Sequence, residues 1–557
     1  MLEISNLALP LDAGLEGKQA EKLVRRAAAR ALNIPPSDIA EIRLLKRSVD
    51  ARKKHDVHFV ATLGVELTGG AQAEAAAIEA AAHRKSAANV KAHHPYETLQ
   101  VPQVDATPQA QNEPRPIVVG TGPAGLFCAL YLARAGLRPL VVERGAAVDE
   151  RMAAVDAFNV GEPLDPHTNI QYGEGGAGTF SDGKLTTNIK SPWAQHVLHL
   201  FVEAGAPEEI LWQAKPHIGT DLLVDIVRNI RKQIEQAGGE VRFNTQLTAL
   251  HFENGRLTQA EITQPEPVTE LIPASRVVLA CGHSARDTFE LVRDAGVHME
   301  QKPFSVGVRI EHPQQLINRS QYGKAADHPA LGAADYKLSM HLRPQKGEEQ
   351  GRGVYTFCMC PGGYVVGAAS ETGSVVTNGM SEYARDGQNS NAALLVGITP
   401  EDFVRASACR HCVQRKIERA AFEAGGGAYS APCQRVGDLF ENRATTALNG
   451  SVQPTYRPGV VPGDLRTVLP DYICDSMAEG IRRMGRRLRG FDDPDALLTA
   501  PETRSSSPVR ILRNETRECP TVRGLFPCGE GAGYAGGITS AAVDGLRCAE
   551  EILKQSL

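Results

Sequence analysis

The stretch Pro116–Gly145, PIVVGTGPAGLFCALYLARAGLRPLVVERG, constrains the fold more than any other part of the chain. A short apolar run leads into Gly120, Gly122 and Gly125, and a helical segment and a second apolar run follow, ending at Glu143. Glycines at this spacing allow a tight strand-to-helix turn, close approach of a pyrophosphate and close packing of the helix on the strand. An acid 23 residues after Gly120 stands where a dinucleotide ribose is bound. The stretch predicts a dinucleotide-binding domain, in which Glu143 disfavours a 2′-phosphate.

Length and composition are those of a globular protein with several domains. The chain has 557 residues, of which 42% are hydrophobic and 22% charged. With 60 basic and 65 acidic residues, it has no overall attraction for nucleic acid or acidic lipid. No apolar run approaches the roughly 20 residues of a membrane helix, and the N-terminus lacks the pattern of a secretion signal. We therefore expect a cytoplasmic protein with no membrane partner.

Eleven cysteines are scattered along the chain, an odd number that predicts reduced, mostly buried thiols. Cys409 and Cys412 form a C-x-x-C, and Cys358 and Cys360 form a C-x-C. No second pair stands at zinc-ribbon spacing, so no metal site is predicted. A redox-active disulfide between Cys409 and Cys412 remains an alternative to buried thiols.

The first part of the chain has the order β-α-β-β-α-β. We expect strands near 2–5, 39–48, 57–67 and 96–101 and helices near 18–32 and 71–83. This order predicts a ferredoxin-like α+β domain over residues 1–101, and the Pro- and Gln-rich residues 102–115 predict a linker. The basic turn 52–55 is either a solvated hairpin tip or a contact for phosphate or RNA.

The remaining chain is predicted to form an α/β Rossmann-like domain that is interrupted by a second domain. Residues 116–303 form the first part of the nucleotide-binding domain, and residues 500–557 complete it. Residues 304–499 between them contain strands separated by turn signals and helices near 400–425 and 470–490. They predict an inserted, mainly antiparallel α+β domain that covers the substrate.

Two further glycine-rich segments point to a site assembled from both ends of the nucleotide fold. The first is the loop 169–184, where so many glycines indicate backbone that passes close to something flat or charged. In the second, a strand ends at Cys528, Gly529 and Glu530 follow, and a helix begins near Ile538. The start of that helix offers N–H groups to an anion or an electron-rich carbonyl.

Together these segments resemble FAD-dependent flavoproteins of the glutathione-reductase type that carry one dinucleotide-binding domain. More narrowly, GEGGAGTFSDGKLTT, CMCPGGYVVGAASE, RSSSPVRI and PCGEGAGYAGGITSAAVDG resemble a bacterial family named FAD-dependent dehydrogenase or oxidoreductase. The resemblance implies non-covalent FAD, with Glu530 in place of the usual Asp. It implies cofactor contacts at Gly120, Gly122, Pro123, Ala124, Gly125, Glu143, Arg144, Gly176, Ser181, Asp182, Gly282, Gly529, Glu530, Gly537 and Ile538.

Two basic residues are candidates for a direct role in the reaction. Lys184 is expected either to stabilise reduced flavin by its charge or to be a structural lysine of the loop. Arg510 is a candidate anchor for an anionic substrate. His283 is a candidate proton donor, with helix capping or packing as the alternative.

The predicted function is a hydride or electron-pair transfer between flavin and an unidentified small molecule. A second GxGxxG is missing, so NAD(P)H is expected at most as a transiently bound electron donor. The alternatives are a flavin-dependent enzyme that modifies RNA and docks it through the N-terminal domain, and a non-catalytic FAD-binding redox sensor. The sequence does not set the substrate or the oligomeric state.

Overall fold

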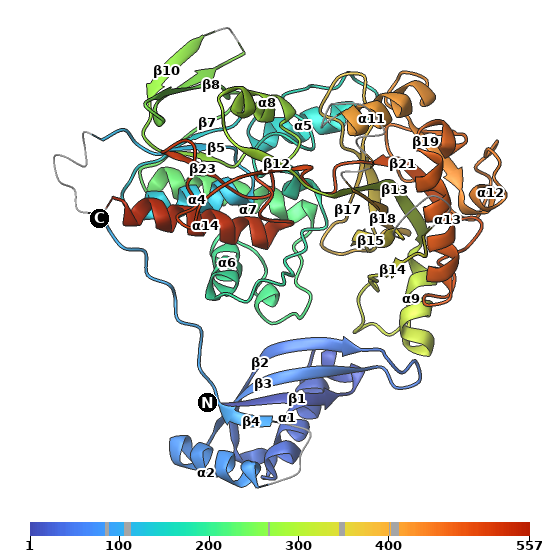
Figure 1. Ribbon diagram of the computed structural model, residues 1–557. Helices are drawn as coiled ribbons and strands as arrows, with labels where there is room; N and C mark the ends of the chain where they lie inside the picture. The colour runs from blue at the N-terminus through green and yellow to red at the C-terminus, as the bar shows by residue number, and fades with distance from the viewer. Residues whose placement is uncertain are drawn as a thin grey trace. The chain divides into compact units, whose positions relative to one another are not determined.

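The structure is a computed structural model that describes residues 1–83, 89–104, 113–265, 268–344, 351–399, 402 and 412–556. It divides into two compact units (Figure 1). Unit 1 comprises Met1–Leu99, Pro207–His217 and Gln314–Asp335, and unit 2 comprises Gln100–Ala206, Ile218–Pro313 and Tyr336–Leu557. Among the described residues, no helix is both long enough and apolar enough to cross a membrane.

Unit 1 has the predicted β-α-β-β-α-β order. Its four strands form an antiparallel sheet in the order β2-β3-β1-β4. The elements are β1 (Leu2–Leu9), α1 (Lys18–Leu32), β2 (Ile39–Asp50), β3 (His58–Leu67), α2 (Gly70–Ala82) and β4 (Asn89–Ala92). The last strand was predicted too late, at 96–101. It comes earlier because residues 89–92 pair directly with the start of β1, from Ser5↔Asn89 to Leu2↔Ala92.

Two short segments from later in the chain complete unit 1. They contain η4 (Glu208–Leu211), α9 (Gln314–Tyr322) and η5 (Gly323–Ala325). The guanidinium of Arg47 lies 4.8 Å from the ring of Phe59 and 4.7 Å from the ring of Trp212, so it joins the first segment to the sheet. Both segments were predicted to belong to later domains, because contacts over such sequence distances leave no local signal.

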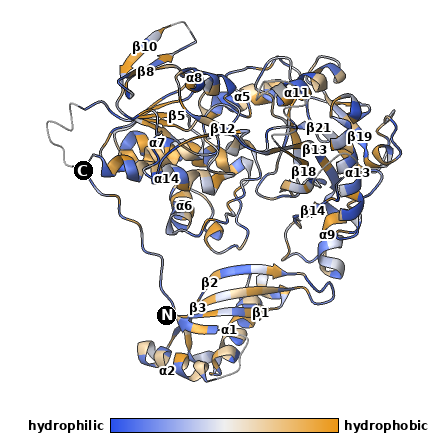
Figure 2. Ribbon diagram, in the orientation of Figure 1, coloured by the Kyte–Doolittle hydropathy of each residue, from blue (hydrophilic) through white to orange (hydrophobic). Residues whose placement is uncertain are grey.

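The nucleotide-binding layer of unit 2 is a five-stranded parallel sheet in the order β23-β11-β5-β6-β7. Its strands are β5 (Ile117–Val119), β6 (Leu140–Val142), β7 (Glu240–Arg242), β11 (Val277–Leu279) and β23 (Leu525–Pro527). The first and last strands in the chain therefore share one sheet. Figure 2 shows the apolar character of this sheet and of its helices. The residues of β5, β6, β11 and β23 are buried.

Helices α4 (Pro123–Arg134) and α14 (Ile538–Lys554) lie side by side against this sheet (Figure 1). A Cβ at Gly545 would lie 2.1 Å from the Ala124 carbonyl oxygen, so this glycine permits the close contact. The other helices of the layer are α5 (Val148–Asn159), α6 (Pro192–Glu203), α7 (Thr220–Gln236) and α8 (Arg286–Asp294). Two small antiparallel sheets complete it: β8 (Gln246–Glu253), β9 (Arg256–Thr263) and β10 (Thr269–Pro273), and β12 (Met299–Gln301) with β22 (Val509–Ile511).

The second layer of unit 2, which we call the cap, is built on a seven-stranded sheet in the order β14-β15-β18-β13-β21-β19-β20. Its strands are β13 (Phe304–Pro313), β14 (Ser339–His341), β15 (Gly353–Cys360), β18 (Asn389–Ile398), β19 (Ala431–Arg435), β20 (Val460–Pro462) and β21 (Leu497–Glu502). All pairs except β19–β20 are antiparallel. The hairpin β16 (Tyr364–Gly367) and β17 (Thr377–Met380) and the helices α11 (Cys412–Ala424), α12 (Val436–Phe440), η6 (Leu465–Thr467) and α13 (Asp471–Gly485) accompany it.

The start of β18 lies in the polar sequence SEYARDGQNSN, which has no strand-like hydropathy pattern. Asn389, Ser390 and Asn391 are nevertheless buried strand residues. The Asn389 side chain, for example, donates to Glu311 at 3.1 Å and to the Gln453 carbonyl at 2.8 Å. Buried polar residues that are hydrogen-bonded carry no signal in a hydropathy pattern.

Candidate functional site

Two glycines of the first glycine turn, Gly120 and Gly125, have no room for a side chain. Gly120 has φ +100°, and a Cβ there would lie 2.5 Å from the Ala280 carbonyl oxygen. A Cβ at Gly125 would lie 1.9 Å from the Gly120 carbonyl oxygen. Helix α4 begins immediately, with Gly122 as its N-cap and Pro123 in its first turn. The strand, turn and helix thus bring free N–H groups to the end of β5, the arrangement that binds a pyrophosphate.

Other glycines border open space. Added Cβ atoms at Gly282, Gly536 and Gly537 would meet nothing within 4 Å, although Gly282 and Gly537 have φ of +71° and +119°. Gly282 follows β11, and Gly537 is the N-cap of α14. At Gly122 the nearest atom to an added Cβ is the Gly176 Cα, 4.0 Å away. Backbone that is bare and uncovered near two helix N-termini fits a dinucleotide such as FAD.

Glu143 lies where predicted, at the end of β6, and its carboxylate is engaged by the protein. One oxygen accepts from the N–H and the hydroxyl of Thr121 at 2.9 and 2.8 Å. The other accepts from the N–H groups of Gly145 and Gly173 at 3.0 and 2.9 Å. The side chain is 6% exposed. Glu143 therefore ties the glycine turn to the loop that begins at Asn169.

Arg144 makes a two-pronged ion pair with Asp287, with both N–O distances 3.0 Å, and stacks 4.5 Å above the ring of Tyr172. It lines a cavity of about 370 Å³, together with residues of the nucleotide layer and of the cap that include Arg286, Glu371 and Arg415. Two more cations of this cavity are paired: Arg286 and Arg415 reach Glu371 at 2.6 and 2.8 Å. The cavity contains Arg144 but none of the residues predicted to surround the flavin ring.

The glycine-rich loop is built around a buried arginine that the sequence analysis did not identify. Arg151 of α5 is 0% exposed and donates to the carbonyls of Asn169, Ile170 and Glu174 at 2.9, 2.8 and 2.6 Å. Burial lowers the pKa of Arg151 to about 10. A charged residue on the buried face of a helix was the available signal, and it is ambiguous because such residues are usually solvated.

Ser181 and Asp182 close this loop. The Ser181 hydroxyl donates to the Gly178 carbonyl at 2.6 Å and accepts from the Gly183 N–H at 3.0 Å. Asp182 is 4% exposed and accepts from Arg385 at 2.8 and 2.5 Å and from the hydroxyl of Ser381. Burial raises the pKa of Asp182, but Lys184 and Arg385 outweigh this effect and hold it below its ordinary value.

Lys184 joins this loop to the cap. Its ammonium lies 3.1 Å from Asp182 and donates to the carbonyl of Met359 in β15. The β15 ladder is irregular there, between Phe357 and Cys360, and Cys358 has φ +39°. Next to it, the hydroxyl of Thr539 in α14 donates to the Leu185 carbonyl at 2.8 Å. The structure thus brings together Lys184, the start of α14 and one strand of the cap.

The turn after β23 is fixed by a hydrogen bond to α14. Gly529 has φ +75°, and its N–H donates to Asp544 of α14 at 2.8 Å. Asp544 also accepts from Arg513 at 2.7 and 2.8 Å. The Glu530 carboxylate is 28% exposed and lies 3.8 Å from Nδ1 of His283, whose Nε2 is 2.7 Å from the Arg504 carbonyl. This last contact agrees with a packing role for His283.

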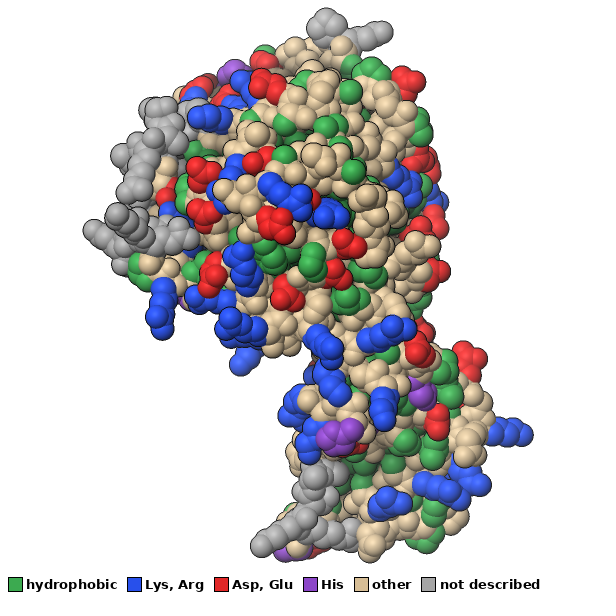
Figure 3. Space-filling view, turned by 90° about the vertical axis from the view of Figure 1, so that its right-hand side faces the viewer, with side chains coloured by type: hydrophobic (Ala, Val, Ile, Leu, Met, Phe, Trp, Pro, Cys, Tyr) green, Lys and Arg blue, Asp and Glu red, His purple; other side chains and the backbone are tan. Residues whose placement is uncertain are grey.

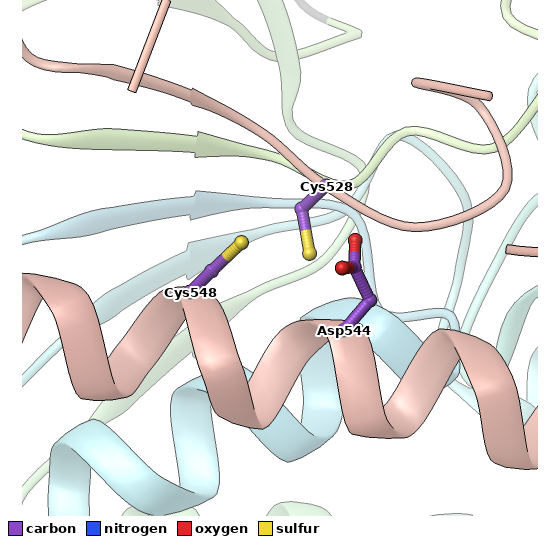
Figure 4. Close-up of side chains that lie close together, drawn as sticks. All are labelled: Cys528, Asp544 and Cys548. Atoms are coloured by element: carbon purple, nitrogen blue, oxygen red, sulfur yellow. The ribbon is translucent and has the colours of Figure 1, made fainter. Parts of the chain in front are cut away.

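Cys528, Asp544 and Cys548 offer ligand atoms within 4.8 Å of one another (Figure 4). Figure 4 shows Asp544 and Cys548 on successive turns of α14, pointing at Cys528. Asp544 is already bound by Arg513 and by Arg517 at 2.6 Å. The neighbouring Cys548 thiol, burial and Asp544 raise the pKa of Cys528 well above its ordinary value. A neutral Cys528 thiol beside two guanidinium groups makes a poor cation site.

The remaining predicted residues are Arg510, Gly176, Ile538 and the pair Cys409 and Cys412. Arg510 is exposed on β22, with its guanidinium 5.5 Å from the Tyr534 ring, and among the described residues no hydrogen bond or ion pair joins it to Lys184. Gly176 begins η3 (Gly176–Phe180), and Ile538 packs on Gly178 from the first turn of α14. Cys409 lies outside the described residues, as does the side chain of Cys412.

The sequence comparisons agree with this arrangement. The family described as "FAD-dependent protein, C-terminal domain-like" matches residues 303–505, and "NAD(P)-binding Rossmann-like domain" matches residues 118–152. A domain of unknown function matches residues 1–66. An uncharacterized protein of Clostridium beijerinckii is 43% identical over 555 residues, which span 100% of this chain and 99% of that protein. The chain belongs to the same family as this protein. It is an FAD-dependent oxidoreductase, and its cofactor is FAD.

Solved flavoproteins resemble this FAD-dependent oxidoreductase only distantly. A flavin-dependent brominase, Bmp2, has a TM-score of 0.38 at 12% identity, with 80% of this chain and 79% of the brominase covered. The glycerol-3-phosphate dehydrogenase of Bacillus halodurans, in complex with FAD, has a TM-score of 0.33 at 10% identity, with 80% and 65% covered.

Proposed function

We propose that the protein binds FAD non-covalently in one dinucleotide-binding domain of the glutathione-reductase type and moves a hydride or electron pair between it and a small molecule. The pyrophosphate then lies at the start of α4, and the adenosine end lies near Glu143 and Arg144. The flavin ring lies between the start of α14 at Gly537 and the loop that ends at Lys184. The row of uncovered glycines at 122, 282, 536 and 537 carries this proposal.

The protein's part in the reaction is to hold charge in place. Bound FAD supplies reversible two-electron chemistry. Lys184 provides a positive charge that favours the electron-rich form of a nearby group, and Asp182 and the Met359 carbonyl fix the position of its ammonium. The N–H groups at the start of α14 add partial positive charge at the same place.

The electron donor and the role of unit 1 are further proposals. NAD(P)H is proposed as the electron donor. Its binding is proposed to be transient, because the sequence has no second GxGxxG to hold it. RNA docking by unit 1 gains no support: Arg52 pairs with Asp50 at 2.5 Å, and Lys54 donates to the Gln321 carbonyl. On the face in Figure 3, the described Lys and Arg side chains are interspersed with Asp and Glu over most of unit 2.

Two matched glycine variants test the FAD site. Gly282 and Gly296 both border open space with positive φ, +71° and +79°, so an alanine at either costs about 1 kcal/mol of folding free energy. Only Gly282→Ala puts a methyl group into the proposed groove, and we expect it to raise the FAD dissociation constant about tenfold. Equal FAD affinity of Gly282→Ala and Gly296→Ala contradicts the proposed path.

Anaerobic stopped-flow absorbance at the flavin band tests the reaction. Mixing the FAD-loaded protein with NADH or NADPH is expected to bleach the band with at least one of them. No bleaching with either nucleotide contradicts NAD(P)H as the donor and directs the search to substrates that reduce the flavin themselves. Absence of a flavin band after FAD titration contradicts the whole proposal.

A further inference from the structure

Four buried polar atoms that lie close together in the cap have no hydrogen-bond partner among the described residues. They are Nη1 of Arg309, Oε2 of Glu502, the Tyr336 hydroxyl and Nδ2 of Asn391. The four side chains belong to one cluster, since Arg309 contacts both Asn391 and Glu502 and interacts electrostatically with Tyr336. Native proteins rarely leave such atoms unpaired, and a cluster of them calls for a functional explanation.

Arg309 is the centre of this cluster. It is 0% exposed on β13, and its Nε donates to the Asn391 side chain at 3.0 Å. Its Nη1 lies 3.5 Å from Oε2 of Glu502, close enough for an ion pair but without hydrogen-bond geometry. The space for the guanidinium exists because residue 379 is glycine: a Cβ there would lie within 2.6 Å of the guanidinium carbon. The site is thus shaped around a loosely paired arginine.

The cluster contacts the strand segment that holds Lys184. Nη2 of Arg309 donates to the Cys358 carbonyl at 3.1 Å and lies 3.5 Å from Sγ of Cys360. These residues flank Met359, whose carbonyl accepts the Lys184 hydrogen bond. A continuous series of contacts therefore runs from Glu502 through Arg309 and residues 358–360 to Lys184.

We propose that Glu502 is a proton-exchanging positioning residue that acts through Arg309 and residues 358–360 on the Lys184 ammonium. This inference rests on the proposed function, because it assigns Lys184 to the flavin site. When ionised, Glu502 draws Nη1 of Arg309 toward itself; when it holds a proton, that attraction is lost. Either change shifts the donor that fixes the Cys358 carbonyl, and with it the acceptor that positions Lys184.

The surroundings of Glu502 support proton exchange near neutral pH. It is 4% exposed, and burial raises its pKa to about 7, although Arg309 lowers it. The titratable groups that face it are Arg309 on β13 and Tyr355 and Cys358 on β15. Lys184 faces Cys358 in turn, and Asp182 faces Cys360. Arg309 is thus the one described cation within ion-pair distance of Glu502.

The positioning half of the proposal is tested with the two-electron midpoint potential of the bound flavin, measured across pH in the FAD-loaded full chain. The wild-type plot is expected to change slope near pH 7, where Glu502 titrates. Glu502→Gln and Lys184→Met are each expected to remove this change, and the double variant to behave as Lys184→Met alone. A slope change that persists in Lys184→Met, or in Glu502→Gln, overturns the proposal.

Glu311→Gln is the matched control. Glu311 lies two residues after Arg309 on β13, is also 0% exposed, and burial likewise raises its pKa. Its carboxylate has partners, however, because it accepts from Thr455 at 2.6 Å and from Asn389 at 3.1 Å. The slope change near pH 7 is expected to remain in this variant. Its loss assigns the proton to Glu311 and overturns the role of Glu502.

A second measurement does not depend on the cofactor. Infrared difference spectra of the full chain between about pH 5 and about pH 9 detect the carbonyl band of a protonated carboxyl group. Wild-type protein is expected to lose one such band with a midpoint near pH 7 that Glu502→Gln lacks and Glu311→Gln retains. If FAD does not bind, the proposed function fails while this titration still decides whether Glu502 holds the proton; absence of the band overturns the proposal.

Discussion

Asp182 pairs with Lys184 directly, whereas Glu502 is linked to Lys184 through Arg309 and residues 358–360. The two carboxylates are equally buried, but their pKa values are shifted in opposite directions. Each is 4% exposed and each faces one arginine. Asp182 accepts two hydrogen bonds from Arg385, at 2.8 and 2.5 Å, and one from the Ser381 hydroxyl, and it forms an ion pair with Lys184. Glu502 has Arg309 at 3.5 Å without hydrogen-bond geometry. The pKa of Asp182 is lowered, whereas burial raises that of Glu502 to about 7.

The comparison shows that donor geometry, more than depth of burial, sets the charge of these carboxylates. Burial alone raises the pKa of both groups. Three well-placed donors reverse that effect at Asp182, so its negative charge is a fixed part of the loop. One loosely placed arginine does not reverse it at Glu502, which leaves that group free to exchange a proton.

Arg385→Met is expected to have the largest effect. It removes the main donor of a buried carboxylate, and breaking a buried pair in this way costs about 4 kcal/mol of the free energy of unfolding. Urea denaturation measures the loss. Arg43→Met is the control, because its pair with Glu41 at 2.7 Å is largely exposed and screened by solvent, so its loss should be far smaller. Equal losses in the two variants show that Arg385 does not hold the charge of Asp182.

Glu502→Gln is expected to change the pH dependence of stability by about 3.5 kcal/mol. The native carboxyl keeps its proton up to about pH 7, whereas the unfolded one releases it near its ordinary pKa of about 4.3. Between these values the native state holds more protons, so the free energy of unfolding of the wild type falls as pH rises and then levels off.

The quantity to compare is the difference between wild type and Glu502→Gln, because other groups also titrate in this range; burial lowers the pKa of His312 to about 4, for example. Relative to the wild type, Glu502→Gln should gain stability from about pH 4 to about pH 7. Asp182 acts in the opposite sense: its lowered pKa adds stability above its ordinary value that is lost as pH falls. Parallel pH profiles of the two proteins contradict the raised pKa of Glu502.

The same contrast separates what could be predicted from the sequence. The turn from Gly120 to Gly125 was predictable because its geometry depends on neighbouring residues: a Cβ at Gly125 would overlap the Gly120 carbonyl. Asp182 and Lys184 were candidates through a resemblance in one continuous loop. The pairing of Arg309 with Glu502 was not predictable, because it joins two distant strands, β13 and β21, whose register no local pattern specifies.

The prediction of the strand at 96–101 failed for the same reason. The strand at 89–92 exists because β1 pairs with it, and the segment 96–101, with its better strand residues, finds no such neighbour among the described strands. Arg151 shows the limit for polar residues: its chemistry suggests solvent, and only the fold places backbone carbonyls around it. Residues whose role depends on long-range contacts remain out of reach of sequence patterns.

Ser381→Ala removes one neutral donor from Asp182 and is expected to cost about 2 kcal/mol, the range of a hydrogen bond to a charged group. It should also raise the pKa of Asp182 while Arg385 keeps the group ionised. Ser390→Ala is the control, because that hydroxyl donates to a neutral acceptor, the His312 carbonyl, at 3.4 Å, and its loss should cost about 1 kcal/mol. A smaller loss for Ser381→Ala than for Ser390→Ala contradicts the contribution of Ser381.

Tyr336→Phe is expected to have the smallest effect, because the hydroxyl it removes has no hydrogen-bond partner among the described residues. Removing a buried group that makes no bond changes the free energy of unfolding by less than about 0.5 kcal/mol and can stabilise the protein. Tyr456→Phe is the matched control: its hydroxyl donates to the Tyr429 carbonyl at 3.0 Å, so the loss should be about 1 kcal/mol. An equal loss for both variants, measured by urea denaturation, means that the Tyr336 hydroxyl is satisfied by bound water. The cluster around Arg309 would then be a complete hydrogen-bond network. Glu502 would differ from Asp182 only in its longer distance to its arginine.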